Sequence, residues 1–236
     1  MIDFKKKNWE ESYGRGENFI YYPKEEAVKF INRYIKKKIS SSEFRDVLNM
    51  DGEQIKGLDF GCGIGRITIL MHEFDIDGYG IDISEVAISE AKNLSKFFNY
   101  GLDKNFFVYD GLKVPFDDNY FDFTISEAVF DSMPFELAKQ LIKEVDRVTK
   151  KYFYLSLIAA ESTQIFKNSN LEESFNGELE VNETHEKGTI QCFYDFDKIE
   201  KLIEKTSFNI KWCEQHIQKN YIQDYMHSRY YVVLEK

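Results

Sequence analysis

The sequence predicts an α/β fold in which a mostly parallel sheet of seven strands carries helices on both faces and ends in an antiparallel strand. Short apolar segments alternate with segments of helical periodicity between residues 54 and 159. This alternation is typical of parallel strands joined by crossover helices. It then stops, and two strand-like segments with a short link between them close the chain, which favours an antiparallel pair.

Residues 1–50 are predicted to form an N-terminal cap segment followed by a helix. Pro23 suits the first turn of a helix, and apolar residues recur at helical spacing from there to about Ile39. Residues 1–22 are polar and aromatic by turns and show no such period. Residues 51–160 then form the predicted ligand-binding core.

Strands and helices alternate through this core. Ser84 is a suitable N-cap for the helix after the second strand, and Glu85 complements the positive end of that helix. The expected helices are 67–74, 85–98, 135–148 and 196–205. The expected strands are 54–60, 77–83, 105–109, 120–126, 152–159, 208–217 and 229–235.

Residues 161–188 interrupt the pattern as an insertion that contains seven Glu and two Lys. The insertion follows a strand, so it should begin at the carboxyl edge of the sheet, where open α/β sheets bind ligands. A solvated surface loop and a lid over the substrate are both compatible with its composition. We treat residues 1–236 as a single domain, in which 189–236 supply the closing helix and strands.

Composition narrows the class of protein. The formal net charge of −10 disfavours nucleic acid as a partner. The three cysteines are far apart in sequence, and no cluster of His and Cys has metal-ligand spacing, so neither disulfides nor a metal site is expected. No apolar run approaches the ~20 residues that span a bilayer, and the N-terminus lacks the apolar core of a signal peptide. We therefore expect a cytoplasmic protein without membrane contact.

The segment LDFGCGIGR, residues 58–66, raises the question of which cofactor a glycine loop of this kind binds. A Walker A loop needs Lys and then Ser or Thr after its last glycine. A dinucleotide turn, G-x-G-x-x-G, has its third glycine one residue later than Gly65. Neither template fits. We expect Cys62 to fill a tight turn and Arg66 to face solvent.

The spacing Asp59-x-Gly61-x-Gly63-x-Gly65 after the first strand resembles motif I of the class I S-adenosylmethionine-dependent methyltransferases. The resemblance covers residues 50–160 well and the closing strands more loosely. It implies a Rossmann-like fold with S-adenosylmethionine as the cofactor. Glycines in such a loop let the backbone approach a ligand closely.

Further positions agree with this family. Asp82, at the end of the second strand, matches the acid that accepts both ribose hydroxyls, and Ile83 matches the residue that packs on adenine. Asp110 in the sequence YDG matches the acid that meets the adenine amino group, with Gly111 after it. The structural alternatives are that Asp82 caps a helix and that Asp110 forms a turn.

The segment FDFTISEAVF resembles the fourth-strand motif that passes beneath the cofactor. The resemblance places Ser126 and Glu127 near the sulfonium. The segment lacks the Asn/Asp-Pro-Pro-aromatic turn that is frequent in methyltransferases acting on exocyclic or amide nitrogens, and this disfavours that class.

The predicted methyl acceptor is a small polar metabolite. ENFIYYPKEEAVKFI resembles N-terminal segments of small-molecule methyltransferases, which indicates a sugar or nucleotide sugar, and the Glu-rich insertion leaves an amine open. A general base helps when the acceptor is a hydroxyl or a charged amine. The candidate bases are His185 and His216. The candidate acceptor-binding residues are Tyr13, Arg15, Tyr21 and Tyr22.

Other functions are compatible with the same motifs. A protein or tRNA methyltransferase is one, although the acidic charge counts against tRNA. A non-catalytic module that binds S-adenosylmethionine is another. A nicotinamide dehydrogenase is disfavoured by Arg66 and by the lack of a second catalytic domain. Nothing in the sequence indicates the oligomeric state.

Overall fold

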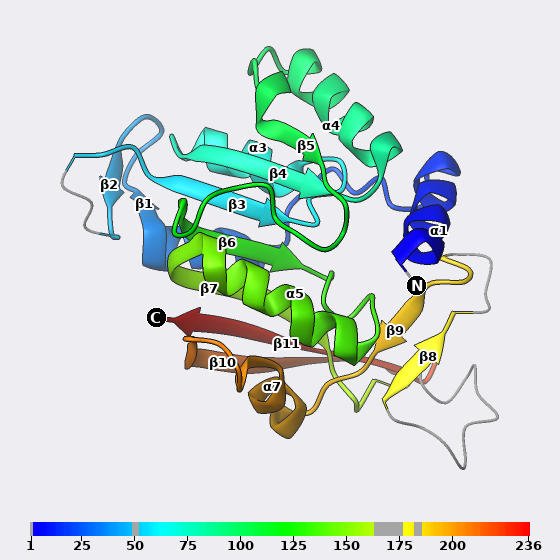
Figure 1. The fold of residues 1–236 in the computed structure, drawn as a ribbon. Helices are drawn as coiled ribbons and strands as arrows, with labels where there is room; N and C mark the ends of the chain where they lie inside the picture. Colours follow the sequence, from blue (N-terminus) through cyan, green and yellow to red (C-terminus); the bar gives the residue numbers. More distant parts are fainter. Residues whose placement is uncertain (1, 49–51, 163–176, 182–185) are drawn as a thin grey trace.

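A seven-stranded sheet forms the centre of the computed structural model, which describes residues 2–48, 52–162, 177–181 and 186–236 (Figure 1). Neighbouring strands run parallel except for the last strand, which is antiparallel to both of its neighbours. The predicted α/β fold is confirmed. Across the sheet the strands are β10 (Asn209–Asn220), β11 (Tyr225–Glu235), β7 (Thr149–Ile158), β6 (Phe121–Glu127), β3 (Lys56–Phe60), β4 (Asp77–Asp82) and β5 (Phe106–Val108).

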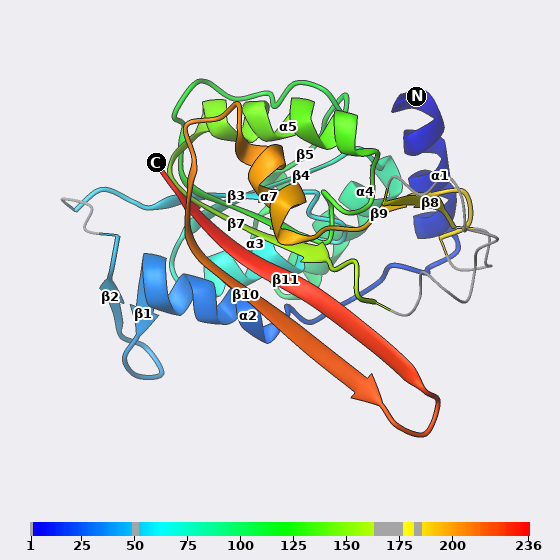
Figure 2. The same ribbon diagram turned by 90° about the horizontal axis from the view of Figure 1, so that it is seen from below.

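Helices cover both faces of the sheet (Figures 1 and 2). On one face lie α5 (Phe135–Val148) and α7 (Phe196–Ile203), and on the other lie α2 (Glu25–Phe30), α3 (Arg66–Glu73) and α4 (Glu85–Phe97). Every residue of the central strand β6 is buried, as expected for a strand covered on both sides. None of the helices within the described residues is long and apolar enough to cross a membrane.

The N-terminal segment contains a helix that the sequence analysis missed. This helix, α1 (Ile2–Gly14), lies beside α4 (Figure 1). The carboxylate of Glu10 accepts hydrogen bonds from the backbone N–H groups of Glu85 and Val86, at 2.9 and 3.2 Å, and from the hydroxyl of Ser84. Among the described residues of α1, only Trp9 and Tyr13 join an apolar cluster with α4. Two such residues are too few to show a helical period in the sequence, so α1 was not predicted.

The helix predicted next along the chain is shorter than expected. A π-helical turn, Ile31–Ile35, follows α2, and β1 (Lys36–Lys38) then pairs antiparallel with β2 (Phe44–Asp46). The ammonium of Lys36 donates to the carbonyl and the carboxylate of Asp75, at 2.7 and 2.8 Å. This contact favours an extended chain where the apolar period predicted a continuing helix.

Part of the predicted insertion forms a second small hairpin, in which β8 (Glu178–Glu180) pairs antiparallel with β9 (Ile190–Cys192). Residues 163–176 and 182–185 of the insertion lie outside the described residues. The candidate base His185 is among them. The prediction that the insertion forms a lid therefore stays a prediction for most of its length.

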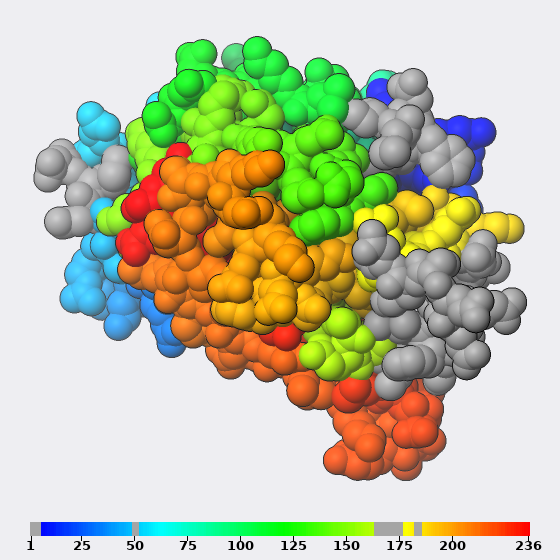
Figure 3. All heavy atoms as spheres, turned by 60° about the horizontal axis from the view of Figure 1, so that its bottom comes forward, coloured from blue at the N-terminus to red at the C-terminus, as the bar shows by residue number. Residues whose placement is uncertain are grey.

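The hairpin of β10 and β11 extends past the rest of the sheet. The pairing of β11 with β7 begins at Arg229, whereas its pairing with β10 begins at Tyr225. The tip therefore stands out from the body of the molecule (Figures 2 and 3). Both strands were predicted, but each is longer than expected on the side of the tip.

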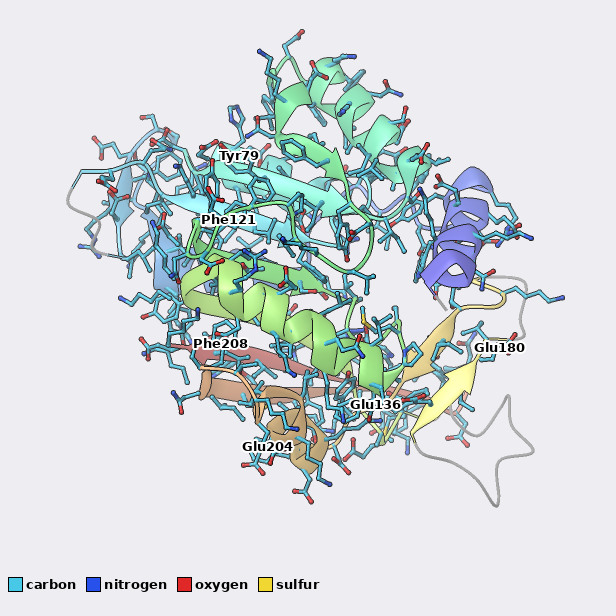
Figure 4. The ribbon with its side chains drawn as sticks, viewed as in Figure 1. Tyr79, Phe121, Glu136, Glu180, Glu204 and Phe208 are labelled. Atoms are coloured by element: carbon cyan, nitrogen blue, oxygen red, sulfur yellow. The ribbon has the colours of Figure 1, made fainter. Side chains whose placement is uncertain are left out.

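Aromatic side chains pack between β4, β5 and the segment before β6. The rings of Tyr79 and Phe121 lie 5.6 Å apart (Figure 4), and Phe116 packs edge-on against both of them. A 3₁₀ turn, Asp103–Asn105, leads into β5. The packing anchors the segment between β5 and β6, whose first residue, Tyr109, lines the pocket described next.

Candidate active site

A pocket opens at the carboxyl ends of β3, β4 and β6, the position at which open α/β sheets bind ligands. The glycine loop after β3, the start of the connection after β4 and the segment after β6 supply one side of it. Side chains of α1 and of the insertion, among them Trp9 and Glu186, supply the other side. The pocket therefore combines the predicted core with the predicted cap.

Two glycines shape the floor of the pocket. Gly61 and Gly63 have φ angles of +75° and +53°, in the left-handed region that favours glycine. A Cβ on Gly61 would lie 2.4 Å from Cγ2 of Val129, and one on Gly63 would lie 2.6 Å from the hydroxyl oxygen of Tyr13. Any side chain here would displace Val129, in the segment after β6, or Tyr13 of α1. Arg66, which we expected to face solvent, also lines the pocket.

Asp82 presents its carboxylate to the pocket from the end of β4. One oxygen accepts the N–H of Gly63 and the other accepts the N–H of Ser84, each at 2.9 Å. A carboxylate oxygen can accept a second hydrogen bond, so both remain able to bind a ligand. Ile83 and Tyr109 line the same part of the pocket. This arrangement suits two adjacent hydroxyls next to a flat apolar ring.

Asp59 lies beneath the glycine loop and does not line the pocket. Its Oδ2 accepts the backbone N–H and the hydroxyl of Thr68, both at 3.0 Å, in the first turn of α3. Burial raises the pKa of Asp59 to about 7. The side chain therefore supports the loop from below, and the predicted contact with the cofactor is not seen in the pocket wall.

Asp110 also lies away from the pocket wall. It is exposed, and its Oδ1 accepts the backbone N–H groups of Leu112 and Lys113, each at 2.8 Å. These hydrogen bonds lower the pKa of the Asp110 carboxyl. The geometry is that of the turn former we considered, and the contact with adenine stays a prediction. The other predicted cofactor residues outside the pocket wall are Gly65, Gly111 and Ser126.

Glu127 reaches the pocket from the end of β6. The hydroxyls of Ser156 and Tyr154 donate to its two oxygens, at 2.6 and 3.2 Å, and the ammonium of Lys24 lies 2.8 Å from Oε1. Burial alone would raise the pKa of Glu127, but the charges of Lys24 and Arg229 outweigh burial and lower it. Glu127 is therefore a carboxylate near neutral pH.

A second buried ion pair lies beside Glu127. Both terminal nitrogens of Arg229 donate to Oδ2 of Asp131, at 2.8 and 2.6 Å, and the two side chains are 9% and 3% exposed. Within the described residues, Asp131 Oδ1 and Arg229 Nε have no hydrogen-bond partner. We call Lys24, Glu127, Asp131 and Arg229 the charge cluster. Sequence analysis identified Glu127 and missed the other three members.

Of the four N-terminal residues predicted to bind the acceptor, one lines the pocket and three do not. Tyr13 lines the pocket over the glycine loop, and burial raises the pKa of its hydroxyl well above its usual range. Arg15 pairs with Glu17 at 2.7 Å and does not line the pocket. Tyr21 and Tyr22 are 52% and 83% exposed and lie outside it. Of these four residues, Tyr13 is therefore the one that lies at the glycine loop.

His216 does not reach the pocket. Its ring nitrogens lie 2.8 Å from Glu214 and 3.4 Å from Glu26 of α2, so the side chain is on the face of the sheet that α2 covers. Among the described residues that line the pocket, none is a histidine. The structure therefore gives His216 no place as a base. The described residues also contain no group of three or more His, Cys, Asp or Glu able to hold a metal ion.

Comparison with known proteins matches part of the chain to a family. Residues 58–155, from the glycine loop to β7, match a family model described as a methyltransferase domain. The matched segment, 98 of the 236 residues, is therefore that of a methyltransferase domain. The resemblance inferred from the glycine loop, with S-adenosylmethionine as the cofactor, is thereby confirmed.

Curated relatives of this chain are named for methyl transfer to different compounds. A sterol 4-C-methyltransferase of Caenorhabditis elegans is 29% identical over 147 residues, which are 57% of this chain and 39% of that protein. A chloroplastic tocopherol O-methyltransferase of Arabidopsis thaliana is 30% identical over 148 residues, 59% of this chain and 42% of that protein. The chain thus spans about two fifths of the length of these relatives.

Solved structures of methyltransferases share the fold of this chain. A methyltransferase of Methanosarcina mazei superposes with a TM-score of 0.65 at 22% identity, covering 80% of this chain and 96% of that one. A magnesium protoporphyrin IX methyltransferase of Synechocystis with bound S-adenosylmethionine has a TM-score of 0.56 at 19% identity, covering 80% and 74%. At these identities the likeness shows the fold.

Proposed function

We propose that this methyltransferase transfers a methyl group from S-adenosylmethionine to a small polar metabolite bound at the charge cluster. The arrangement of a single pocket supports this proposal. The glycine loop and Asp82 shape one end, which we call the cofactor end, and the charge cluster lines the other, which we call the acceptor end. Methyl transfer requires two ligands held end to end, and the pocket offers a different chemistry to each.

The residues at the cofactor end fit S-adenosylmethionine. Gly61 and Gly63 line the pocket with main chain that has no side chain over it, so a ligand can approach the backbone closely. Asp82 would hold the ribose hydroxyls, while Ile83 and Tyr109 would flank the adenine. The bound cofactor supplies a methyl group already activated by a positively charged sulfur. The remaining tasks of the protein are to align the acceptor and to exclude water.

The two ends meet where β3 and β6 lie side by side. Val129 packs against Gly61, and Glu127 precedes it by two residues at the end of β6. The carboxylate of Glu127 would therefore lie next to the reacting centre, where a negative charge stabilises a nearby positive sulfur. In this proposal Glu127 orients both the donor and the acceptor.

Contacts between α1 and the insertion support a small acceptor. The amide of Asn8 donates to the carbonyl of Gly188, and the carboxylate of Glu17 accepts the N–H of Glu186 at 3.1 Å. These contacts connect the N-terminal segment to the insertion over the pocket. A pocket covered in this way favours a metabolite over a protein or tRNA chain. A sugar or nucleotide sugar stays the leading compound class from the sequence resemblance, and Glu186 makes the insertion part of the pocket wall.

A non-catalytic role is the second candidate, because this fold does not by itself require methyl transfer. One solved structure with a TM-score of 0.57 and 17% identity is named a [4+2]-cyclase. That name shows that the fold also occurs in a protein named for another reaction. In the second candidate, this chain would bind S-adenosylmethionine without consuming it. Release of S-adenosylhomocysteine in the presence of an acceptor separates the two candidates.

The test begins with calorimetric titration of S-adenosylmethionine, S-adenosylhomocysteine and NAD. We expect the first two to bind and NAD not to bind. The protein is then incubated with S-adenosylmethionine and fractionated metabolite extracts, and S-adenosylhomocysteine and new methylated masses are followed. Tighter binding of NAD would overturn the cofactor. Binding of S-adenosylmethionine with no turnover above that of the Asp82→Ala variant, in any fraction, would favour the non-catalytic candidate.

A further inference from the structure

The acceptor end already holds an ammonium group supplied by the protein itself. Lys24 Nζ lies 2.8 Å from Glu127 Oε1, and the hydroxyls of Ser156 and Tyr154 hold the carboxylate in place from its other sides. Asp131 and Arg229 neutralise one another beside it. If Lys24 moved away, Glu127 would keep one negative charge without an ion pair among the described residues.

Lys24 is the member of the charge cluster that can leave. Its side chain is 36% exposed, whereas that of Glu127 is 3% exposed. It comes from the N-cap position of the short helix α2, not from the sheet. Burial lowers the pKa of the Lys24 ammonium, because removing the charged group from water is unfavourable. Arg229, in contrast, is held from β11 by two hydrogen bonds to Asp131.

We propose that Glu127 is the recognition site for an amine of the methyl acceptor, and that the Lys24 side chain occupies this site until the acceptor binds. The inference rests on the proposed methyltransferase function and names the acceptor class. The amine enters as an ammonium, pairs with Glu127, and Lys24 turns to solvent. One buried ion pair replaces another, so no buried charge is left unpaired during the exchange.

Other acceptor chemistries fit this site less well. A carboxylate would face the carboxylates of Glu127 and Asp131, and like charges at short range repel. A neutral hydroxyl that displaced Lys24 would leave the buried charge of Glu127 without a counter-ion, which is costly.

The transfer step balances with an amine. The ammonium R–NH₃⁺ first gives a proton to water, and Glu127 keeps the resulting R–NH₂ in place as a hydrogen-bond acceptor. The nitrogen lone pair then forms a bond to the methyl carbon. The carbon–sulfur bond breaks and its electron pair stays on sulfur, which becomes neutral. The products are R–NH₂⁺–CH₃ and S-adenosylhomocysteine, with no metal or redox partner required.

The Lys24→Ala variant tests the inference, because it removes the atoms of a propylammonium ion. We titrate n-propylamine, propionate and 1-propanol at neutral pH into this variant saturated with S-adenosylhomocysteine. Propylamine should bind Lys24→Ala at least ~10-fold more tightly than it binds the wild type, the change that about 1.4 kcal/mol produces. The gain should disappear in Lys24→Ala/Glu127→Gln. Lys29→Ala, which removes an exposed lysine paired with Glu25 at 2.9 Å, is the matched control and should resemble the wild type.

With S-adenosylmethionine in place of its product, Lys24→Ala should form N-methylpropylamine, detected by mass spectrometry. Equal binding of propionate or propanol, or a gain that survives Glu127→Gln, would overturn the inference. If Lys24→Ala does not unfold cooperatively, the three probes are compared on Lys24→Gln, in which the amine should still bind most tightly. Binding of S-adenosylhomocysteine in the same samples keeps the two proposals apart: its loss from the wild type would refute the proposed function itself.

Discussion

The two ends of the pocket are built in different ways. At the cofactor end the floor is main chain, bent by Gly61 and Gly63, and the key side chain, Asp82, follows within the same βαβ unit. The acceptor end consists of side chains from three separate parts of the chain, namely the start of α2, β6 with the turn after it, and β11, with members as far apart in sequence as Lys24 and Arg229. A backbone requirement leaves a local pattern of glycines in the sequence, whereas a cluster assembled by folding leaves none.

The largest expected effect comes from breaking the acceptor end. Asp131→Ala leaves the charge of Arg229 buried without its partner, and removing one member of a buried pair costs about 3–5 kcal/mol. Urea unfolding measures the loss. The matched control is Asp118→Ala, which removes the 73% exposed partner of Arg147 and should cost less than about 1 kcal/mol. Equal losses in the two variants would show that the charge cluster is no more critical than a surface pair.

At the cofactor end we expect a pH dependence from Asp59. Its pKa of about 7 in the folded protein exceeds its ordinary value of 3.8, so the folded state binds the proton more tightly than the unfolded state does. Its contribution to the unfolding free energy is therefore greatest in acid and falls as the pH rises from about 4 to about 7. The slope approaches about 1.4 kcal/mol per pH unit, or about 4 kcal/mol in all.

Asp59→Asn isolates this effect, because all other titrating groups are shared with the wild type. The unfolding free energy of the wild type minus that of the variant should decrease between pH 4 and 7 and stay level above. Urea unfolding at intervals of one pH unit measures it. A difference that does not vary with pH would mean that Asp59 titrates alike in the folded and unfolded states.

A smaller effect separates Asp82 from Asp110, the two acids that the sequence assigned to the adenosine group. If Asp82 holds the ribose hydroxyls, Asp82→Ala should weaken S-adenosylhomocysteine binding at least ~10-fold, because charge-assisted hydrogen bonds are lost. Asp110→Ala should change it much less, since Asp110 is exposed and engaged in its own turn. Calorimetry compares the two. An equal loss in Asp110→Ala would establish the adenine contact that the family resemblance implies.

The smallest expected effect concerns the cover of the cofactor end. Glu10 of α1 accepts N–H groups from the first turn of α4, as a helix cap does, so Glu10→Ala should destabilise the protein by about 1 kcal/mol. Thermal unfolding measures this cost. Glu11→Ala, one position along the same helix, is the control and should be nearly neutral. If the two variants behave alike, α1 is not held in place by this cap.

The contrast between the two ends also explains what sequence could predict. The seven strands and the helices between them were recognisable because each repeats an apolar pattern, and Asp82 was recognisable because it ends a strand of that pattern. The helix α1 was not, because among its described residues only Trp9 and Tyr13 join an apolar cluster, too few to show a helical period, and its other contacts with α4 are polar. Lys24, Asp131 and Arg229 lie far apart in the sequence and form no recognisable motif. They become a group only when β6, β11 and the start of α2 pack together.

The most direct test of the division between the two ends is calorimetric titration of S-adenosylhomocysteine into Glu127→Gln beside the wild type. The neutral sulfur of this ligand leaves the Glu127 charge without a cation to attract, and Asp82 and the glycine loop are untouched. We predict a dissociation constant within about threefold of the wild type, less than 1 kcal/mol, in a variant that no longer turns over. Binding weakened by ~10-fold or more would contradict the account, because Glu127 would then belong to the cofactor end.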